Sequence, residues 1–230
     1  MKLLALDSAT EACSVALYID GEVRERFEVA PRRHTQLLMP MVHSLLAEAG
    51  IGFSDLDLLA YAQGPGSFTG LRIAAGAVQG LALGLDRPVI GISTLAALAS
   101  RAMRVGQAQQ VAVAMDARMN QVYWGQYALD KSGQCRELTA DSLRNPEQVP
   151  RLAPDAWQVA GAGWLRYAAR LGEVSGLRPD TRQIELYPHA EQVAALAVEH
   201  TRHGAGVSAS MVQPVYLRLQ VAEKMKPQRR

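Results

Sequence analysis

The chain has 230 residues, of which 49% are hydrophobic and 20% charged. These values are typical of a soluble globular protein with one large domain or two small ones, and they exclude intrinsic disorder. The net charge is only +2, which does not indicate strong nucleic-acid binding by the chain alone. No apolar run reaches the roughly 20 residues that a bilayer requires, and we expect a cytoplasmic protein.

The first half of the chain predicts a three-stranded β-meander followed by alternating helices and strands. Expected strands lie at 3–6, 14–19, 22–28, 57–62 and 88–92, and expected helices at 35–49, 71–85 and 94–103. Asp20-Gly21 is a strong hairpin signal, and Gly50 is a typical stop for the first helix. Pro40 lies inside that helix and removes one backbone donor.

The same pattern then starts again. A strand at 111–115 ends in Asp116, as the strand at 3–6 ends in Asp7, and a second strand follows each aspartate after a polar turn. Further strands are expected at 122–129 and near 158–160, helices at 164–171 and 188–203, and surface loops at 141–154 and 172–186. A repeated meander, helix, strand and helix is the pattern of the actin-like ATPase and sugar-kinase superfamily. The alternative is a single α/β domain whose strands happen to end in aspartate.

The most distinctive motif is the loop 64–70, Gly-Pro-Gly-Ser-Phe-Thr-Gly, between an expected strand and an expected helix. Ser67 or Thr69 can cap the helix, and the helix N-terminus beside Arg72 can hold an anion such as phosphate. No lysine follows the last glycine, so the loop is not a P-loop, and its spacing is not the dinucleotide-binding G-x-G-x-x-G. A tight, capped turn explains the same residues equally well.

Each expected half has an aspartate at the end of its first strand. With small polar neighbours such aspartates can hold magnesium and phosphate, or they can cap the next turn. Arg118 is expected to pair with Asp116 and to discourage a metal there. The candidate nucleotide or phosphate residues are Asp7, Ser8, Thr10, Gly66, Ser67, Thr69 and Arg72.

The histidines do not have the spacing of a metal site. A helical site starting at His34 needs a second histidine four residues later, and Leu38 occupies that place. His43 leaves the helix from about the opposite face. We therefore expect structural or solvated histidines, no metal and no catalytic residue.

The helix expected at 71–85 carries Gly76, Gly80 and Gly84 at every fourth position. Each glycine inside a helix costs about 0.5–1 kcal/mol relative to alanine, so close approach by another element is expected in compensation. The helix is apolar on more than one side, which indicates burial on more than one side. Its partner is either this chain's own sheet and first helix or another subunit.

Four segments form a set that is distinctive of one family. They are Leu6-Asp7-Ser8-Ala9-Thr10, the loop and helix start at 64–72, the stretch 115–123, and Pro214-Val215-Tyr216-Leu217-Arg218. Together they resemble the bacterial TsaB (YeaZ) family along essentially the whole chain. The resemblance implies an α/β fold of two actin-like (ASKHA, ribonuclease H-like) lobes, each a mixed sheet with flanking helices. The expected lobes are 1–105 and 106–222, the last segment of the second packing back on the first, with a basic tail at 223–230.

The resemblance also implies a role in forming N6-threonylcarbamoyladenosine (t6A) beside the anticodon of tRNA. In that family the larger paralogue TsaD transfers the threonylcarbamoyl group, TsaB binds and activates TsaD, the ATPase TsaE joins them, and TsaC makes the activated intermediate. The implied chain has no activity alone and requires no cofactor, ATP or ADP being bound in the complex. It contacts tRNA through the complex, and Lys224, Lys226, Arg229 and Arg230 of the tail are the local candidates for direct contact.

The family pairs through helices of its N-terminal lobe, either with itself or with TsaD. Here these are the helices at 35–49 and 71–85, and we expect a four-helix contact with two helices from each subunit. The expected interface residues are Leu37, Leu38, Met41, Leu45, Ile73, Gly76, Ala77, Gly80 and Gly84. One rival function is an ATP-dependent phosphotransferase or ATPase of the same fold, with Asp7 holding magnesium. The other is an M22-like metallopeptidase, which Leu38 disfavours because it stands where His-x-x-x-His would end.

Overall fold

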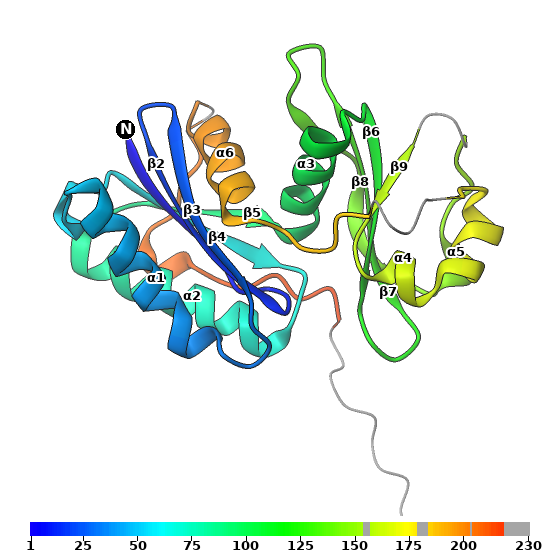
Figure 1. Ribbon diagram of the computed structural model, residues 1–230, viewed down its shortest axis with the longest axis horizontal. Coiled ribbons are helices and arrows are strands. Elements are labelled where there is room, and N and C mark those ends of the chain that lie inside the picture. Colours follow the sequence, from blue (N-terminus) through cyan, green and yellow to red (C-terminus); the bar gives the residue numbers. More distant parts are fainter. Residues whose placement is uncertain (154–156, 179–183, 203, 219–230) are drawn as a thin grey trace, which may run out of the picture.

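The computed structural model describes residues 1–153, 157–178, 184–202 and 204–218. Two lobes lie side by side, each built on a mixed β-sheet (Figure 1). The strand order is β3-β2-β1-β4-β5 in the first sheet and β8-β7-β6-β9 in the second. The duplicated arrangement expected from the two Asp-terminated strands is therefore present.

The first sheet contains the predicted meander. Its strands are β1 (Lys2–Asp7), β2 (Ala12–Ile19), β3 (Glu22–Val29), β4 (Leu58–Gly64) and β5 (Val89–Ser93). The first three strands pair antiparallel, whereas β4 pairs parallel to β1 and β5 parallel to β4. Asp20 and Gly21 both have positive φ, as a two-residue hairpin turn requires.

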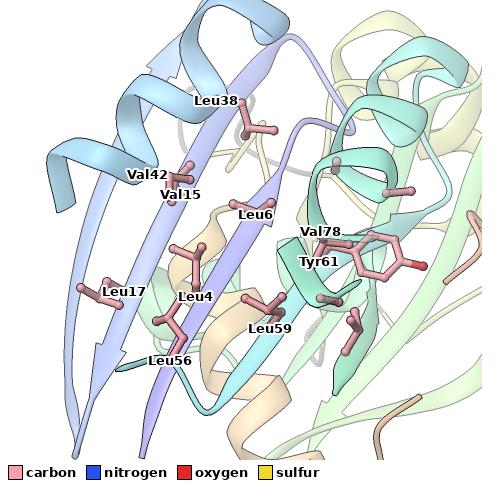
Figure 2. Packing of buried hydrophobic residues seen from close by; sticks show 14 of the residues in the cluster. Leu4, Leu6, Val15, Leu17, Leu38, Val42, Leu56, Leu59, Tyr61 and Val78 are labelled. Atoms are coloured by element: carbon pink, nitrogen blue, oxygen red, sulfur yellow. The ribbon is translucent and has the colours of Figure 1, made fainter. Parts of the chain in front are cut away.

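Helices cover both faces of the first sheet. The helices α1 (His34–Ala49) and α2 (Phe68–Leu85) lie on one face and α6 (Ala190–Thr201) on the other (Figure 1). Figure 2 shows the buried residues between the sheet and the first two helices, among them Leu6, Val15, Leu38 and Val78. Alternate β1 residues, Leu3 and Ala5, pack with α6. This alternation explains why the strand reads as a continuous apolar run.

Both long helices begin earlier than predicted. The helix α1 starts at His34 and ends at Gly50, which adopts the left-handed conformation expected of a C-terminal glycine. The helix α2 starts at Phe68 rather than Leu71, because Ser67 is its N-cap and accepts a hydrogen bond from the Gly70 amide.

The second lobe differs from its prediction in several places. Its elements are β6 (Gln110–Asp116), β7 (Val122–Leu129), β8 (Cys135–Arg144), β9 (Gln158–Ala160), α4 (Gly163–Arg166) and α5 (Ala168–Ser175). The strand β8 was missed, and its end lies in the predicted loop 141–154. The helix predicted at 164–171 is interrupted at Tyr167 and continues to Ser175, into the predicted loop 172–186. The helix predicted at 188–203 is shorter, ending at Thr201, and His203 lies outside the described residues.

The repeat is incomplete. The strand β9 pairs parallel to β6, as β4 pairs parallel to β1, so the meander and its fourth strand recur. The first-lobe helix between meander and fourth strand has no counterpart: between β8 and β9 the described residues form only the short 3₁₀ turn η2 (Pro146–Gln148).

Two helices pack across the predicted lobe boundary. The division after residue 105 assigns α3 (Thr94–Gly106) to the first lobe, yet Leu95 and Leu98 of α3 pack with Val111 of β6. Conversely α6 packs on the first sheet, as the expected return of the last segment implies. The lobes are therefore joined through buried helices as well as through the chain connections.

A C-terminal strap, residues 213–218, also joins the lobes. The Tyr61 hydroxyl donates to the Gln213 carbonyl (2.8 Å) and the Val215 amide to the Gln63 carbonyl (2.7 Å). At its end the Arg218 guanidinium donates to the Ala117 carbonyl of the second lobe (2.9 Å). The predicted basic tail, within 219–230, lies outside the described residues.

Candidate functional site

A cleft of about 1130 Å³ lies between the two lobes. Its walls are the β1–β2 turn, the starts of α1 and α2, the β6–β7 turn, the start of α4, and the C-terminal strap. The ends of both Asp-terminated strands lie near it, and Asp116 lines it. A nucleotide or phosphate site of the predicted kind would therefore lie in this cleft.

The glycine-rich loop is packed against the β1–β2 turn. The Ser67 amide donates to the Ala9 carbonyl (2.7 Å), and the Ser8 hydroxyl donates to the Gly70 carbonyl (2.8 Å). A Cβ on Gly66 would lie 2.5 Å from the Ala9 oxygen, and one on Gly70 would overlap the Ser8 oxygen. The glycines thus allow two segments of this chain to approach each other, so the geometry favours the capped-turn interpretation.

Asp7 is buried beneath the cleft. Its side chain is 1% exposed, and Oδ1 accepts the Ala9 amide (2.8 Å). No partner for the buried Oδ2 occurs in the described part of the chain. Burial raises the pKa of Asp7 to about 7, against the opposing effects of the Ala9 amide and the charge of His189. In this conformation Asp7 offers no atom to a ligand in the cleft.

The other predicted phosphate residues do not converge on one point. Thr10, Gly66 and Ser67 line the cleft, whereas Ser8 is fully buried. Thr69 and Arg72 lie on the exposed first turn of α2, outside the lining.

Asp116 is held by arginines. Its Oδ2 lies 3.0 Å from Nη1 of Arg118 and 3.1 Å from Nη1 of Arg166, and Oδ1 accepts the Arg118 amide (3.0 Å). The predicted pairing with Arg118 is confirmed, and Arg166 is a second partner that the sequence did not indicate. Two guanidinium groups on one carboxylate make that carboxylate a poor ligand for a cation.

The histidines have local structural contacts. Nε2 of His34 lies 2.9 Å from the Thr10 carbonyl and 3.2 Å from the Ala12 carbonyl, so it carries a proton and donates to both. Nδ1 of His189 lies 2.8 Å from Oε2 of Glu25, and its ring stacks on Phe27. Among the described residues no group of three or more His, Cys, Asp or Glu side chains could hold a metal ion.

The outward face of α2 is not covered by any residue that the structure describes near its three glycines. No atom lies within 4 Å of the Cβ positions of Gly76, Gly80 and Gly84, and Leu83 is 77% exposed. No charged residue occurs between Ile73 and Leu85. The intramolecular explanation of the glycine stripe is therefore wrong: the inner face packs on the sheet, and the glycines face outward.

Two residues of the predicted interface belong to the core. Leu38 and Leu45 are 2% and 0% exposed and belong to the core between the sheet and the helices. Figure 2 shows Leu38 in this core. Leu37, Met41, Ile73 and Ala77 are half-buried at the edge of the same helical layer. Sequence reasoning missed Leu83, which the stripe spacing could have found, because it lies three residues after Gly80 and seven after Gly76.

The comparisons with known proteins agree on one family. The family described as "TsaD: tRNA N6-adenosine threonylcarbamoyltransferase" matches residues 27–159, more than half of the chain. Two relatives named "tRNA threonylcarbamoyladenosine biosynthesis protein TsaB" are similar over nearly their whole length. The Escherichia coli K12 protein is 42% identical, with 99% of each chain covered, and the Haemophilus influenzae protein is 40% identical, covering 100% of this chain and 98% of its own. The chain belongs to the TsaB family.

A solved structure supports the same assignment. YeaZ from Pseudomonas aeruginosa superposes with a TM-score of 0.86 at 47% sequence identity, covering 94% of this chain and 99% of that one. The predicted TsaB (YeaZ) resemblance and the two-lobed actin-like fold are thus confirmed. Among the described residues of this TsaB-family chain, α2 alone has the length and apolar composition that a membrane-spanning helix requires. Packing against the sheet explains why the inner face of α2 is apolar, but it does not explain the apolar outer face.

The cleft of this TsaB-family chain also contains residues that the sequence did not single out. Four arginines line it, Arg32, Arg118, Arg166 and Arg218, against two acids, Glu11 and Asp116. They come from four separate segments of the chain, so no local run of basic residues announces them. Arg118 and Arg218 lie within the quoted motifs 115–123 and 214–218, but neither was assigned to a binding site, and Arg32 and Arg166 were in no quoted motif.

Proposed function

We propose that this chain is a non-catalytic activating subunit in t6A biosynthesis, which acts in the cytoplasm by binding the catalytic paralogue TsaD. Membership of the TsaB family supports a part in t6A formation, since its relatives carry that biosynthetic name. In this proposal TsaD transfers the threonylcarbamoyl group to tRNA, TsaE completes the assembly, and the same helical surface also allows a homodimer.

The observation that carries the proposal is the outward face of α2. Three glycines at helical spacing each cost stability, and the open space around them indicates that the described part of the chain gives no compensation. Glycines on one stripe let another helix approach the backbone closely, because no side chain stands between the axes. An uncharged face with Leu83 exposed suits such a helix.

The interior of the cleft supports a role without chemistry in this chain. The glycine-rich loop is occupied by the β1–β2 turn, Asp7 is buried, and Asp116 is held by two arginines. A phosphotransferase needs a free phosphate cradle and an ionised carboxylate for magnesium. We therefore propose that any ATP or ADP needed for the reaction is bound elsewhere in the complex, and that this chain requires no cofactor.

Gly80→Leu tests the docking surface. We expect it to weaken binding to TsaD on the order of 10- to 100-fold, because a side chain forced into a close helix contact typically costs 1–3 kcal/mol or more. Reconstituted t6A formation should fall accordingly at limiting concentrations. Co-purification with TsaD and product analysis of tRNA measure the two effects.

The matched control is Ala195→Leu, an equally exposed helical position on α6, across the sheet from α2. It should leave TsaD binding and t6A formation unchanged. A folded Gly80→Leu variant that still binds TsaD with unchanged affinity would show that the stripe is not the docking surface.

A further inference from the structure

The cleft between the lobes carries a local excess of positive charge. Four arginines against two acids line it, in a chain whose total net charge is only +2. The small net charge of the whole chain therefore understates the positive electrostatic potential in the cleft. An excess of one sign of charge in a cleft attracts ligands of the opposite sign.

The arginines have donors available for a ligand. Arg32 has no acidic partner in the part of the chain that the structure describes, and it is exposed at the start of α1. Arg118 and Arg166 are 68% and 51% exposed, and each holds Asp116 through Nη1. Nη2 of Arg118 also lies 3.5 Å from Oε1 of Glu11. A guanidinium has five N–H donors, so each retains donors for an anion such as phosphate.

Aromatic rings lie among these arginines. Phe68 is 40% exposed, and its ring centroid lies 5.4 Å from that of Tyr216, another lining residue. The guanidinium of Arg72 lies over the Phe68 ring, 3.9 Å from its centroid. Tyr187 lines another part of the wall. Of these rings Phe68 is exposed, and Tyr187 and Tyr216 are half-buried. Aromatic rings beside arginines form a recurring surface on which single-stranded nucleic acids stack their bases and neutralise their phosphates.

A single nucleotide fits this cleft less well than a strand. The volume of about 1130 Å³ exceeds the roughly 300–1,000 Å³ of typical small-molecule pockets. The loop that would cradle a terminal phosphate is filled by the β1–β2 turn, and its Ser67 amide is bonded to Ala9. The arginines come from the starts of α1 and α4, the β6–β7 turn and the strap, so they are spread along the cleft. Spread charges match successive phosphates of a chain.

We propose that the cleft binds a single-stranded segment of RNA directly, through its phosphates and stacked bases. This inference rests on the proposed function only in naming tRNA as the source of that RNA. It replaces the expectation that tRNA is contacted through the complex alone or through the C-terminal tail.

The test uses the full chain and a fluorescein-labelled, mixed-sequence single-stranded RNA of twelve nucleotides. Fluorescence anisotropy gives the affinity between 50 mM and 1 M salt for the wild type and for the double variant Arg32→Gln/Arg166→Gln. Losing two phosphate contacts should reduce the slope of log affinity against log salt concentration by about 1.4. If the wild type and the variant have equal affinity at 1 M salt, this corresponds to about 25-fold weaker binding by the variant at 0.1 M. The double variant Arg151→Gln/Arg202→Gln, exposed and outside the cleft, should bind like the wild type.

Phe68→Leu separates stacking from charge. It should weaken RNA binding without changing the salt slope, because a stacked base carries no phosphate contact. The proposal is overturned if the wild type does not bind the RNA at 50 mM salt, or if the Arg32/Arg166 variant binds as tightly as the wild type. Displacement of the RNA by equimolar ATP would instead make the cleft a nucleotide site and would also overturn it.

The two proposals can fail separately. The Arg32→Gln/Arg166→Gln variant keeps the α2 face intact, so it should still co-purify with TsaD. Gly80→Leu leaves the cleft intact and should still bind the RNA. Loss of TsaD binding in the first variant, or of RNA binding in the second, would show that the surfaces are not independent as the structure has them.

Discussion

Asp7→Asn separates a structural from a catalytic role for the most buried acid of the cleft region. Oδ1 of Asp7 accepts the Ala9 amide, and an asparagine oxygen can accept the same bond. Oδ2 has no partner in the described chain, so the substitution removes the ionisable group without removing a known contact. A magnesium ligand would not tolerate that change, whereas a buried, neutral turn residue would.

The size of the effect follows from the pKa. Burial raises the pKa of Asp7 from 3.8 to about 7, so the folded chain binds this proton more tightly than the unfolded chain. Asp7 therefore favours folding at low pH. Its contribution is lost as the pH rises from about 4 towards 7 and is gone above that. The difference corresponds to about 4 kcal/mol of unfolding free energy.

Urea denaturation of both proteins at several pH values between 4 and 8 measures this. The unfolding free energy of the wild type minus that of Asp7→Asn should fall by about 4 kcal/mol across that range, because other titrating groups and the constant cost of the amide cancel. A difference that stays constant, or that rises with pH, would mean that Asp7 is ionised in the folded chain and would refute the reasoning. In reconstitution the variant should support t6A formation fully, whereas the phosphotransferase alternative requires it to be inactive.

Three further stability effects follow from single contacts, each measurable from urea midpoints. Gly70→Ala should lower the free energy of unfolding by at least about 1–3 kcal/mol, because its Cβ overlaps the Ser8 oxygen. Gly76→Ala has open space around its Cβ and should raise the free energy of unfolding by about 0.5–1 kcal/mol. Ser93→Ala should cost about 1–2 kcal/mol, since its hydroxyl caps the amides of Leu95 and Ala96 and donates to Asp141. Arg166→Gln should cost less than about 1 kcal/mol, because the pair is partly exposed and Asp116 keeps Arg118. Equal effects of the two glycine substitutions, or a neutral Ser93→Ala, would contradict these assignments.

The elements that the sequence predicts well are those with a buried face. The strands β1, β2 and β6 are almost wholly buried apolar runs, and the helices α1 and α2 end at left-handed residues just after their apolar pattern stops. The strand β8 was missed because its residues are exposed or half-buried, so no alternation marks it. Its identity depends on pairing with β7, which is a tertiary contact.

The candidate surfaces were harder to predict than the fold. Helical periodicity groups Leu38 and Leu45 with Leu37 and Met41, but the angle at which α1 lies on the sheet decides which of them are covered. The cleft arginines have no sequence signal because distant segments bring them together. The glycine-rich loop was ambiguous, because a phosphate and a carbonyl oxygen such as that of Ala9 make the same demand for a residue without Cβ.

The equivalent strand ends of the two lobes are held by the same kinds of contact within the chain. In each lobe the aspartate after the first strand accepts the amide two residues later, Ala9 for Asp7 and Arg118 for Asp116. In each, a glycine also approaches a backbone carbonyl: a Cβ on Gly66 would lie 2.5 Å from Ala9, and one on Gly163 would lie 2.7 Å from Ala114. Contacts within the chain thus occupy both strand ends, where a phosphate would otherwise meet backbone amides. The arginines of the cleft and the outward face of α2 then remain the surfaces that we propose for partners from outside the chain.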